Sequence, residues 1–272
     1  MLRDMLYGAM NLPIRPVLKE IEVIAALGFD YMELTMDSPR AHHSVILKQK
    51  QKILAALDRH GMRLVCHLPT FVSTADLTTR LREASVRETL EALEVAASLQ
   101  PLKVVLHPSM IVGLSVLVIH QAREYAMKSL SVIADKAEAL GIDLCLENLF
   151  PQSHSLVEPE DFIEVFERFP YLKMTLDTGH ANIGDRGGRR ALDFLRRFGD
   201  RIGHVHASDN FGKEDNHLPI GVGMIDFPKI MKALRRISYN DTITLEVFSR
   251  DKDYLRISRE KLAAMAAAED TG

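Results

Sequence analysis

The chain has 272 residues, of which 47% are hydrophobic, and it carries a formal net charge of -3 with a pI near 6.4. This length is enough to bury a large core and is typical of one barrel-type domain, so we expect residues 1–272 to form a single domain. The near-neutral charge gives no global basic field, which argues against broad electrostatic capture of nucleic acid or of an anionic membrane.

No segment of the sequence indicates a membrane protein or a disulfide-stabilised scaffold. The most apolar segment, residues 110–119, is too short to cross a bilayer, and the N-terminal MLRDMLYGAM lacks the long apolar stretch of a signal peptide. Cys66 and Cys145 lie in apolar, strand-like runs, which indicates core packing in a reducing compartment. We therefore expect a cytoplasmic protein that does not bind membranes.

Strand-like and helix-like segments alternate along the whole chain. The expected strands cover residues 5–9, 31–35, 63–67, 103–107, 142–147, 172–177, the start of 202–225, and 242–246. The expected helices cover residues 16–27, a segment ending at 60–61, and 81–99, 121–140, 160–169, 191–198, 227–237 and 253–268. Apolar residues at helical spacing and glycines that follow several helices support these ranges.

These segments make eight strand–helix units. Strands that are separated by helices must run parallel, because a parallel neighbour requires a long crossover connection. The pattern therefore predicts an α/β fold, specifically a (β/α)8 TIM barrel. A doubly wound open sheet is the competing architecture, but no glycine-rich phosphate loop follows the first expected strand.

Ionisable residues occur where the expected strands end. In a barrel, the side chains at the carboxyl ends of the strands converge on one mouth. The residues that end strands two to eight are Glu33, His67, His107, Glu147, Asp177, His206 and Glu246. Three more, His180, Asp215 and His217, lie in the loops just beyond. Converging carboxylates repel one another unless a cation neutralises them, so the pattern predicts a bound divalent metal.

Four of these residues end consecutive strands and could surround one metal ion with three oxygens and one nitrogen: Glu147, Asp177, His206 and Glu246. The remaining residues could bind substrate oxygens, orient the ligands or hold further metals: His67, His107, His180, Asp215 and His217. Mixed oxygen and nitrogen donors admit manganese, zinc, magnesium, cobalt or iron. We expect one metal ion, with up to about three possible.

Five other histidines do not lie at the end of an expected strand. His42, His43, His60, His120 and His154 fall at expected helix ends or in surface loops. We interpret them as surface or helix-end residues without a role in the site.

The motifs around the strand ends resemble those of the xylose isomerase-like TIM barrel superfamily. They are HLP at His67, LHPS at His107, LENLFP at Glu147, LDTGHAN at Asp177, HVHASDN at His206, DNHLPIGVGMIDF at Asp215 and LEVF at Glu246. The resemblance covers nearly the whole chain. In the sugar isomerase and epimerase branch, it implies that Glu147, Asp177, His206 and Glu246 bind one divalent metal and that the two glutamates also move protons.

A second branch of this superfamily is endonuclease IV. There the resemblance implies that all nine matching residues, those four with His67, His107, His180, Asp215 and His217, hold a three-zinc cluster that hydrolyses DNA at abasic sites. In the motif MELT, Glu33 stands where the sequence resembles the sugar enzymes and not the nuclease. We expect Glu33 to contribute to substrate binding. The form DNHLPIGVGMIDF also resembles sugar isomerases, and the near-neutral charge agrees.

The sequence therefore predicts a metal-dependent isomerase or epimerase of a sugar, sugar phosphate or related hydroxy-carbonyl compound. Glu147 and Glu246 would act as acid and base around a metal-stabilised enediolate, and His180 and His217 would bond substrate oxygens. The alternative is a zinc-dependent abasic-site phosphodiesterase with DNA as its partner. A lesser alternative is a non-catalytic module that binds metal and sugar. The sequence alone does not indicate the oligomeric state.

Overall fold

Eight parallel strands form a closed barrel in the order β1 to β8, and β8 pairs with β1. They belong to a computed structural model that describes residues 5–185 and 188–268. The strands are β1 (Leu6–Met10), β2 (Tyr31–Thr35), β3 (Arg63–His67), β4 (Val104–Leu106), β5 (Leu144–Glu147), β6 (Lys173–Asp177), β7 (Ile202–Ala207) and β8 (Thr242–Leu245). The prediction of a (β/α)8 TIM barrel is confirmed.

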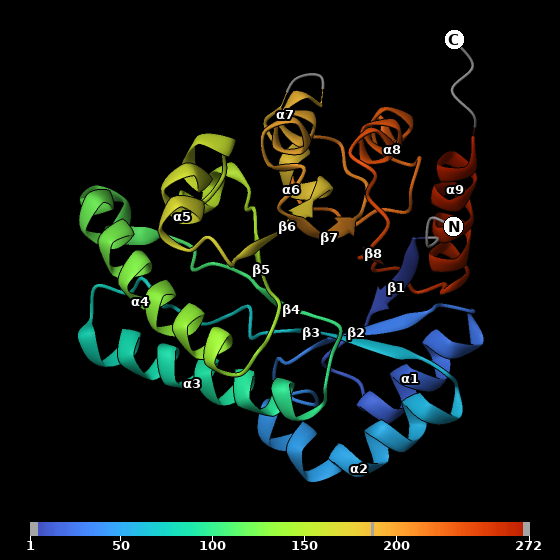
Figure 1. Ribbon diagram of the computed structural model, residues 1–272, viewed down its shortest axis with the longest axis horizontal. Helices are drawn as coiled ribbons and strands as arrows, with labels where there is room; N and C mark the ends of the chain where they lie inside the picture. The colour runs from blue at the N-terminus through green and yellow to red at the C-terminus, as the bar shows by residue number, and fades with distance from the viewer. Residues whose placement is uncertain (1–4, 186–187, 269–272) are drawn as a thin grey trace.

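Helices connect the strands and surround the barrel as an outer ring (Figure 1). The longer ones are α1 (Val17–Ala26), α2 (His43–Arg59), α3 (Thr79–Ser98), α4 (Ile119–Ala139), α7 (Arg189–Phe198), α8 (Phe227–Arg236) and α9 (Asp253–Ala267). The shorter ones are α5 (Ile163–Arg168), α6 (Thr178–Asn182) and the 3-10 helices η1 (Gly113–Val118), η2 (Pro151–Ser153) and η3 (Pro159–Phe162). A large cluster of buried apolar side chains from both layers forms the core.

The strands are rich in apolar residues because both of their faces are covered. Every residue of β2 and β5 is buried, as expected for a parallel sheet that packs against helices outside and against its own side chains inside. Gly28 and Gly141 follow α1 and α4 with φ angles of 75° and 67°, a left-handed conformation that ends a helix at little cost for glycine. The expected helix ends at these glycines therefore agree with the structure.

The main differences from the expected elements lie at the barrel mouth. β4 ends at Leu106 and β8 at Leu245, so His107 and Glu246 directly follow their strands. The short helix α6 was not expected, because its five residues are too few for a helical period to be detected. It begins where the carboxylate of Asp177 accepts a hydrogen bond from the backbone N–H of His180 at 2.6 Å.

Two further observations concern membrane spans and cysteines. Within residues 5–185 and 188–268, no helix has the length and apolar character that crossing a bilayer requires. Cys66 and Cys145 are both free and buried, which agrees with their expected role in core packing.

Candidate metal centre at the barrel mouth

Four neighbouring strands bring together the four residues expected to hold a metal. Glu147 and Asp177 are the last residues of β5 and β6, His206 is the penultimate residue of β7, and Glu246 directly follows β8. All four are buried. The register pairs Asp177 with His206 on adjacent strands, so the carboxyl ends of these strands present their side chains at a similar height.

The three carboxylates approach the same nitrogen of one imidazole. His206 Nδ1 lies 3.1 Å from Glu246 Oε1, 3.3 Å from Glu147 Oε1 and 3.7 Å from Asp177 Oδ2. Donor atoms of Glu147, Asp177 and His206 all lie within 4.8 Å of one another. Buried carboxylates and an imidazole at this spacing form a donor set that suits a divalent cation, whose charge would offset their mutual repulsion.

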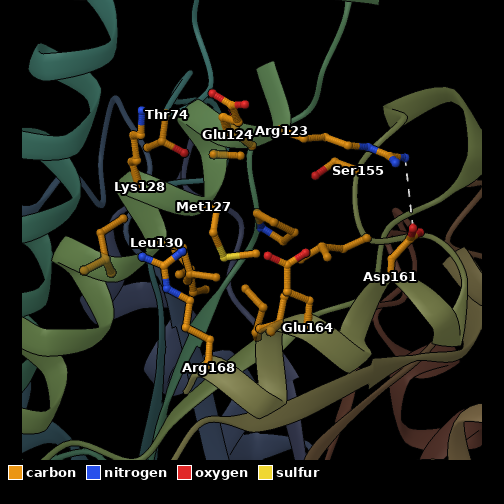
Figure 2. A pocket seen from close by; sticks show the side chains of 18 of the residues that line it. Thr74, Arg123, Glu124, Met127, Lys128, Leu130, Ser155, Asp161, Glu164 and Arg168 are labelled. Atoms are coloured by element: carbon orange, nitrogen blue, oxygen red, sulfur yellow. Dashed lines mark ion pairs between the residues drawn. The ribbon is translucent and has the colours of Figure 1, made fainter. Parts of the chain in front are cut away.

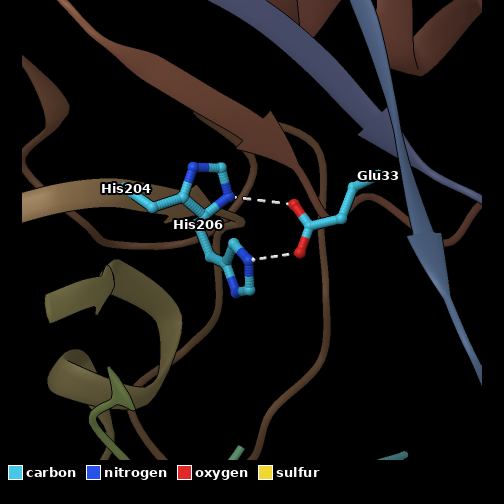
Figure 3. A group of neighbouring side chains, drawn as sticks. All are labelled: Glu33, His204 and His206. Atoms are coloured by element: carbon cyan, nitrogen blue, oxygen red, sulfur yellow. Dashed lines mark hydrogen bonds and ion pairs between the residues drawn. The ribbon is translucent and has the colours of Figure 1, made fainter. Parts of the chain in front are cut away.

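Glu33 lies beneath this cluster, where it contacts two histidines of β7 (Figure 3). Its Oε1 lies 3.0 Å from His206 Nε2, and its Oε2 lies 2.9 Å from His204 Nε2. The Thr244 hydroxyl also donates to Oε2. Because Nε2 of His206 is engaged by Glu33, its Nδ1 is the nitrogen that faces the three carboxylates.

Glu33 lies deeper in the barrel than the other expected site residues, and its substrate-binding role stays a prediction. β2 continues to Thr35, and Thr35 is in register with His67 of β3. Glu33 is therefore two residues deeper in the barrel than the mouth layer. Its side chain is fully buried, and both of its oxygens contact protein groups.

The electrostatics of this lower layer are consistent with a fixed ionic contact. Burial raises the pKa of Glu33, but the charge of His206 and the hydrogen bonds from His204 and His206 outweigh burial and hold that pKa well below its usual range. Burial lowers the pKa of His204 to about 4, so this imidazole is neutral near pH 7. His204 was not among the expected site residues, although strand parity puts it on the same face as His206.

Glu147 makes a second histidine contact on the other side of the cluster. Its Oε2 lies 3.3 Å from His67 Nε2, and His67 Nδ1 lies 2.8 Å from the carbonyl oxygen of Leu68. Burial raises the pKa of Glu147, but His206 and His67 more than reverse this effect. Burial lowers the pKa of His67, yet its hydrogen bond to Glu147 raises the net value to about 9.

Glu246 has a matching arrangement with His217. Its Oε1 faces His206, and its Oε2 lies 3.7 Å from His217 Nδ1. Burial raises the pKa of Glu246 to about 7, partly opposed by the charge of His206 and reinforced by that of Asp177. Thus each of the two glutamates directs one oxygen to the centre and the other toward a flanking histidine.

Asp215 lies between two histidines of the mouth, His180 and His217. Its Oδ2 lies 2.8 Å from His217 Nε2 and 3.3 Å from His180 Nε2. Burial raises the pKa of Asp215, but its hydrogen bonds to His180 and His217 outweigh burial and lower the pKa well below its usual range. Its Oδ1 is buried without a hydrogen-bond partner, so one acceptor at the mouth is left free for a ligand.

His107 is the most isolated of the expected site residues. It directly follows β4, it is buried, and its Nδ1 has no hydrogen-bond partner. Its ring lies 6.5 Å from that of His67 and 6.2 Å from that of His180, between centroids. Burial lowers the pKa of His107 to about 4, so it is neutral near pH 7.

Asn148 was missed by the sequence reasoning, although it directly follows Glu147. Its amide oxygen accepts from the Asp177 N–H at 2.8 Å, and its amide nitrogen donates to the Asp177 carbonyl at 3.1 Å. Its own carbonyl accepts from His180 Nδ1 at 2.9 Å. Asn148 therefore fixes the end of β6 and leaves His180 Nε2 directed toward Asp215. A polar amide inside a strand-end motif was the only available signal.

Asp209, which lies after β7, was also left out. Its carboxylate accepts hydrogen bonds from four backbone N–H groups, those of Asn210, Gly221, Gly223 and Ile225, at 2.9–3.1 Å. These bonds close the segment that carries Asp215 and His217. A Cβ atom at Gly223 would lie 2.4 Å from Asp209 Oδ1, which explains why glycine occupies this position.

A separate cavity of about 600 Å³ lies between α4, α5 and the outer faces of β4 and β5 (Figure 2). Its lining includes apolar residues such as Leu146 and charged residues such as Arg123 and Glu164. Of the ten residues that the sequence analysis singled out, only His107 contributes to this lining. Apart from His107, the converging carboxylates and histidines therefore lie at the barrel mouth and do not line this cavity.

Comparisons with known proteins agree with this architecture. Residues 21–268 match the family described as xylose isomerase-like TIM barrel. An uncharacterised protein of Methanocaldococcus jannaschii is 30% identical over 283 residues, covering 98% of this chain and 95% of that protein. A D-psicose 3-epimerase of Ruminiclostridium cellulolyticum is 33% identical over 131 residues, covering 47% of this chain and 42% of the epimerase.

A solved structure gives the same picture at the level of the whole barrel. The crystal structure of a D-tagatose 3-epimerase-like protein superposes with a TM-score of 0.85 at 28% identity, covering 96% of this chain and 97% of that one. Together with the closed eight-stranded barrel, the family match over most of the sequence shows that this chain belongs to the xylose isomerase-like TIM barrel family.

Proposed function

We propose that this protein is a divalent-metal-dependent epimerase or isomerase that acts on the carbon next to the carbonyl group of a sugar, most simply a ketose. Two relatives named above are sugar 3-epimerases or similar to one, and the chemistry of the barrel mouth is suited to that reaction. A sugar phosphate is a further candidate, because one sequence does not decide which substrate the mouth loops admit.

The observation that carries the proposal is the paired arrangement of Glu147 and Glu246. Each glutamate directs Oε1 toward His206 Nδ1, at 3.3 and 3.1 Å, and Oε2 toward a flanking histidine, His67 or His217. Epimerisation requires removal of a proton from one face of a carbon and delivery of a proton to the opposite face. Two carboxylates around one centre can supply the base and the acid for these steps.

The other mouth residues would position the substrate and the glutamates. His180 and His217, both linked to Asp215 Oδ2, can donate hydrogen bonds to substrate oxygens. Glu147, Asp177, His206 and Glu246 would hold the metal; when bound, the metal supplies positive charge that stabilises negative charge on the substrate's carbonyl oxygen. These donors admit manganese, zinc, magnesium, cobalt or iron.

The test measures two things, the configuration of the sugar product and the exchange of a carbon-bound proton with solvent. The protein, loaded in turn with manganese, cobalt and zinc, is incubated in deuterium oxide with D-psicose, D-tagatose and a panel of other ketoses and aldoses. We expect a new epimer or isomer that carries deuterium at the reacting carbon. Glu147→Gln and Glu246→Gln should each lower kcat by at least about 1,000-fold, because each removes one proton-transfer group.

The matched control is Glu214→Gln, an exposed glutamate of the same mouth loop, which should retain turnover. Metal content is measured for every variant, so that loss of proton transfer is separated from loss of the metal. A fully active Glu246→Gln protein would contradict the two-glutamate assignment.

The abasic-site nuclease stays the alternative, and cleavage of an abasic duplex by the zinc-loaded protein, abolished by chelator, would favour it. Binding of a sugar without turnover across the panel would favour the non-catalytic module.

A further inference from the structure

A second group of imidazoles and carboxylates lies in the outer ring of helices, where α2 begins beside α3. His42 is the residue that caps α2, and His43 is its first residue. Glu88 and Glu91 are three residues apart on α3, which places them on one face of that helix. These residues take no part in the barrel-mouth cluster.

Their side-chain atoms converge on one point. Glu88 Oε1 lies 2.8 Å from His42 Nε2 and 3.1 Å from His43 Nε2. One donor atom from each of these three residues lies within 4.8 Å of the other two. Glu91 Oε2 approaches His43 Nε2 to 3.6 Å. With metal–ligand bonds of about 2.0–2.2 Å, neighbouring donors around a tetrahedral ion lie about 3.3–3.6 Å apart, so these spacings need little change to hold one.

A second observation separates this cluster from an ordinary surface ion pair. The side chain of His43 is only 10% exposed, and its Nε2 is buried without a hydrogen-bond partner, although it points at Glu88. Buried polar atoms are normally satisfied, and an unmet one requires an explanation. A cation between the two imidazoles and the carboxylate would satisfy this nitrogen directly.

The first imidazole is held in place by the turn that begins α2. His42 Nδ1 accepts a hydrogen bond from the Ser44 backbone N–H at 3.2 Å and lies 2.9 Å from the Ser44 hydroxyl oxygen, and its Nε2 points at Glu88.

We propose that His42, His43 and Glu88 form a second metal site, with Glu91 as a fourth donor, which binds a divalent transition metal such as zinc and links α2 to α3. Two nitrogen and two oxygen donors are typical ligands of zinc and of its neighbours in the first transition series. The site is independent of the proposed catalytic function, because none of its residues belongs to the barrel mouth.

The experiment counts zinc bound to the full chain. Wild type, His42→Asn, Glu88→Gln and a control are dialysed against the same zinc solution, and metal per chain is measured by elemental mass spectrometry. Asparagine is a favoured helix cap, so His42→Asn removes the imidazole and preserves the start of α2. The control is His60→Asn at the other end of α2, where His60 pairs with a single carboxylate, that of Glu22, at 2.8 Å.

We expect wild type and His60→Asn to bind about one zinc ion per chain more than His42→Asn and Glu88→Gln. Zinc should also raise the Tm of wild type by more than that of the two site variants, because the metal binds only the folded pair of helices. Equal zinc content and equal Tm shifts in all four proteins would overturn the proposal and leave an ion pair between α2 and α3. Loss of barrel-mouth activity alone would not affect this comparison.

Discussion

His206 owes its orientation to contacts on both of its ring nitrogens. Glu33 engages Nε2 from below, and Nδ1 faces the carboxylates of the mouth. A residue that fixes the tautomer and direction of a ligating imidazole typically influences metal affinity nearly as strongly as a ligand does. Glu33 is therefore best described as a positioning residue.

Replacing Glu33 tests this role at the scale of one residue. Glu33→Gln removes the negative charge that holds His206 and His204, so we expect the metal affinity of the mouth to fall by about 10–100-fold. Competition with a chromophoric chelator measures this affinity. All proteins in this comparison also carry His42→Asn, so that the measured affinity is that of the barrel mouth alone. Glu22→Gln, on the exposed surface, is the control. Unchanged affinity would show that the contact does not orient the ligand.

The segment between β7 and α8 is the element that carries the mouth residues Asp215 and His217. It contains no helix or strand of its own between Ser208 and Asp226, yet Asp209 gathers four of its backbone N–H groups on one buried carboxylate. Such a carboxylate replaces the hydrogen-bond ladder that a regular element would provide. The Asp209 carboxylate therefore holds the base of the loop, together with the backbone pairing between Asp209 and Leu218.

Removing this carboxylate should loosen the loop before it unfolds the barrel. Asp209→Ala leaves four backbone donors without an acceptor, which costs about 1–3 kcal/mol for each donor that water does not reach. We expect faster hydrogen exchange and faster proteolysis within residues 208–226, and a higher KM. Asp193→Ala, which removes an exposed ion pair on α7, should change neither. Equal exchange rates in the two variants would argue against this role of Asp209.

At the scale of the whole molecule, the buried ionisable groups make stability depend on pH. Burial lowers the pKa of His107 and of His204 to about 4, from 6.5 in an exposed imidazole. Between pH 6.5 and 4 the unfolded chain binds more protons at these positions than the folded chain does. The contribution of these two neutral histidines to the free energy of unfolding is therefore fully present above pH 6.5 and is lost as the pH falls toward 4.

A single substitution can measure one part of this dependence. Between pH 6.5 and 4.5, His107→Leu should lose less free energy of unfolding than wild type does, by about 2–3 kcal/mol, because leucine takes up no proton. Urea denaturation at a series of pH values gives both curves. His120→Gln, at an exposed position, should follow wild type. Parallel curves for wild type and His107→Leu would contradict the assignment.

The alternation of segments was sufficient to predict the closed barrel, because eight strands separated by helices have few other ways to bury both faces. It also predicted which strand ends meet: Glu147, Asp177, His206 and Glu246 converge as strand parity requires. These features depend on local periodicity, which a sequence records directly.

Only the tertiary structure decided the depth and direction of each side chain. Glu33 and His204 proved to lie one layer below the mouth, because strand register and tilt, set by all eight strands together, determine height within a barrel. Asn148 acts on Asp177 from an adjacent strand. The meeting of His42 and His43 with Glu88 depends in the same way on how α2 packs beside α3. Such contacts join residues far apart in the chain, and no local pattern encodes them.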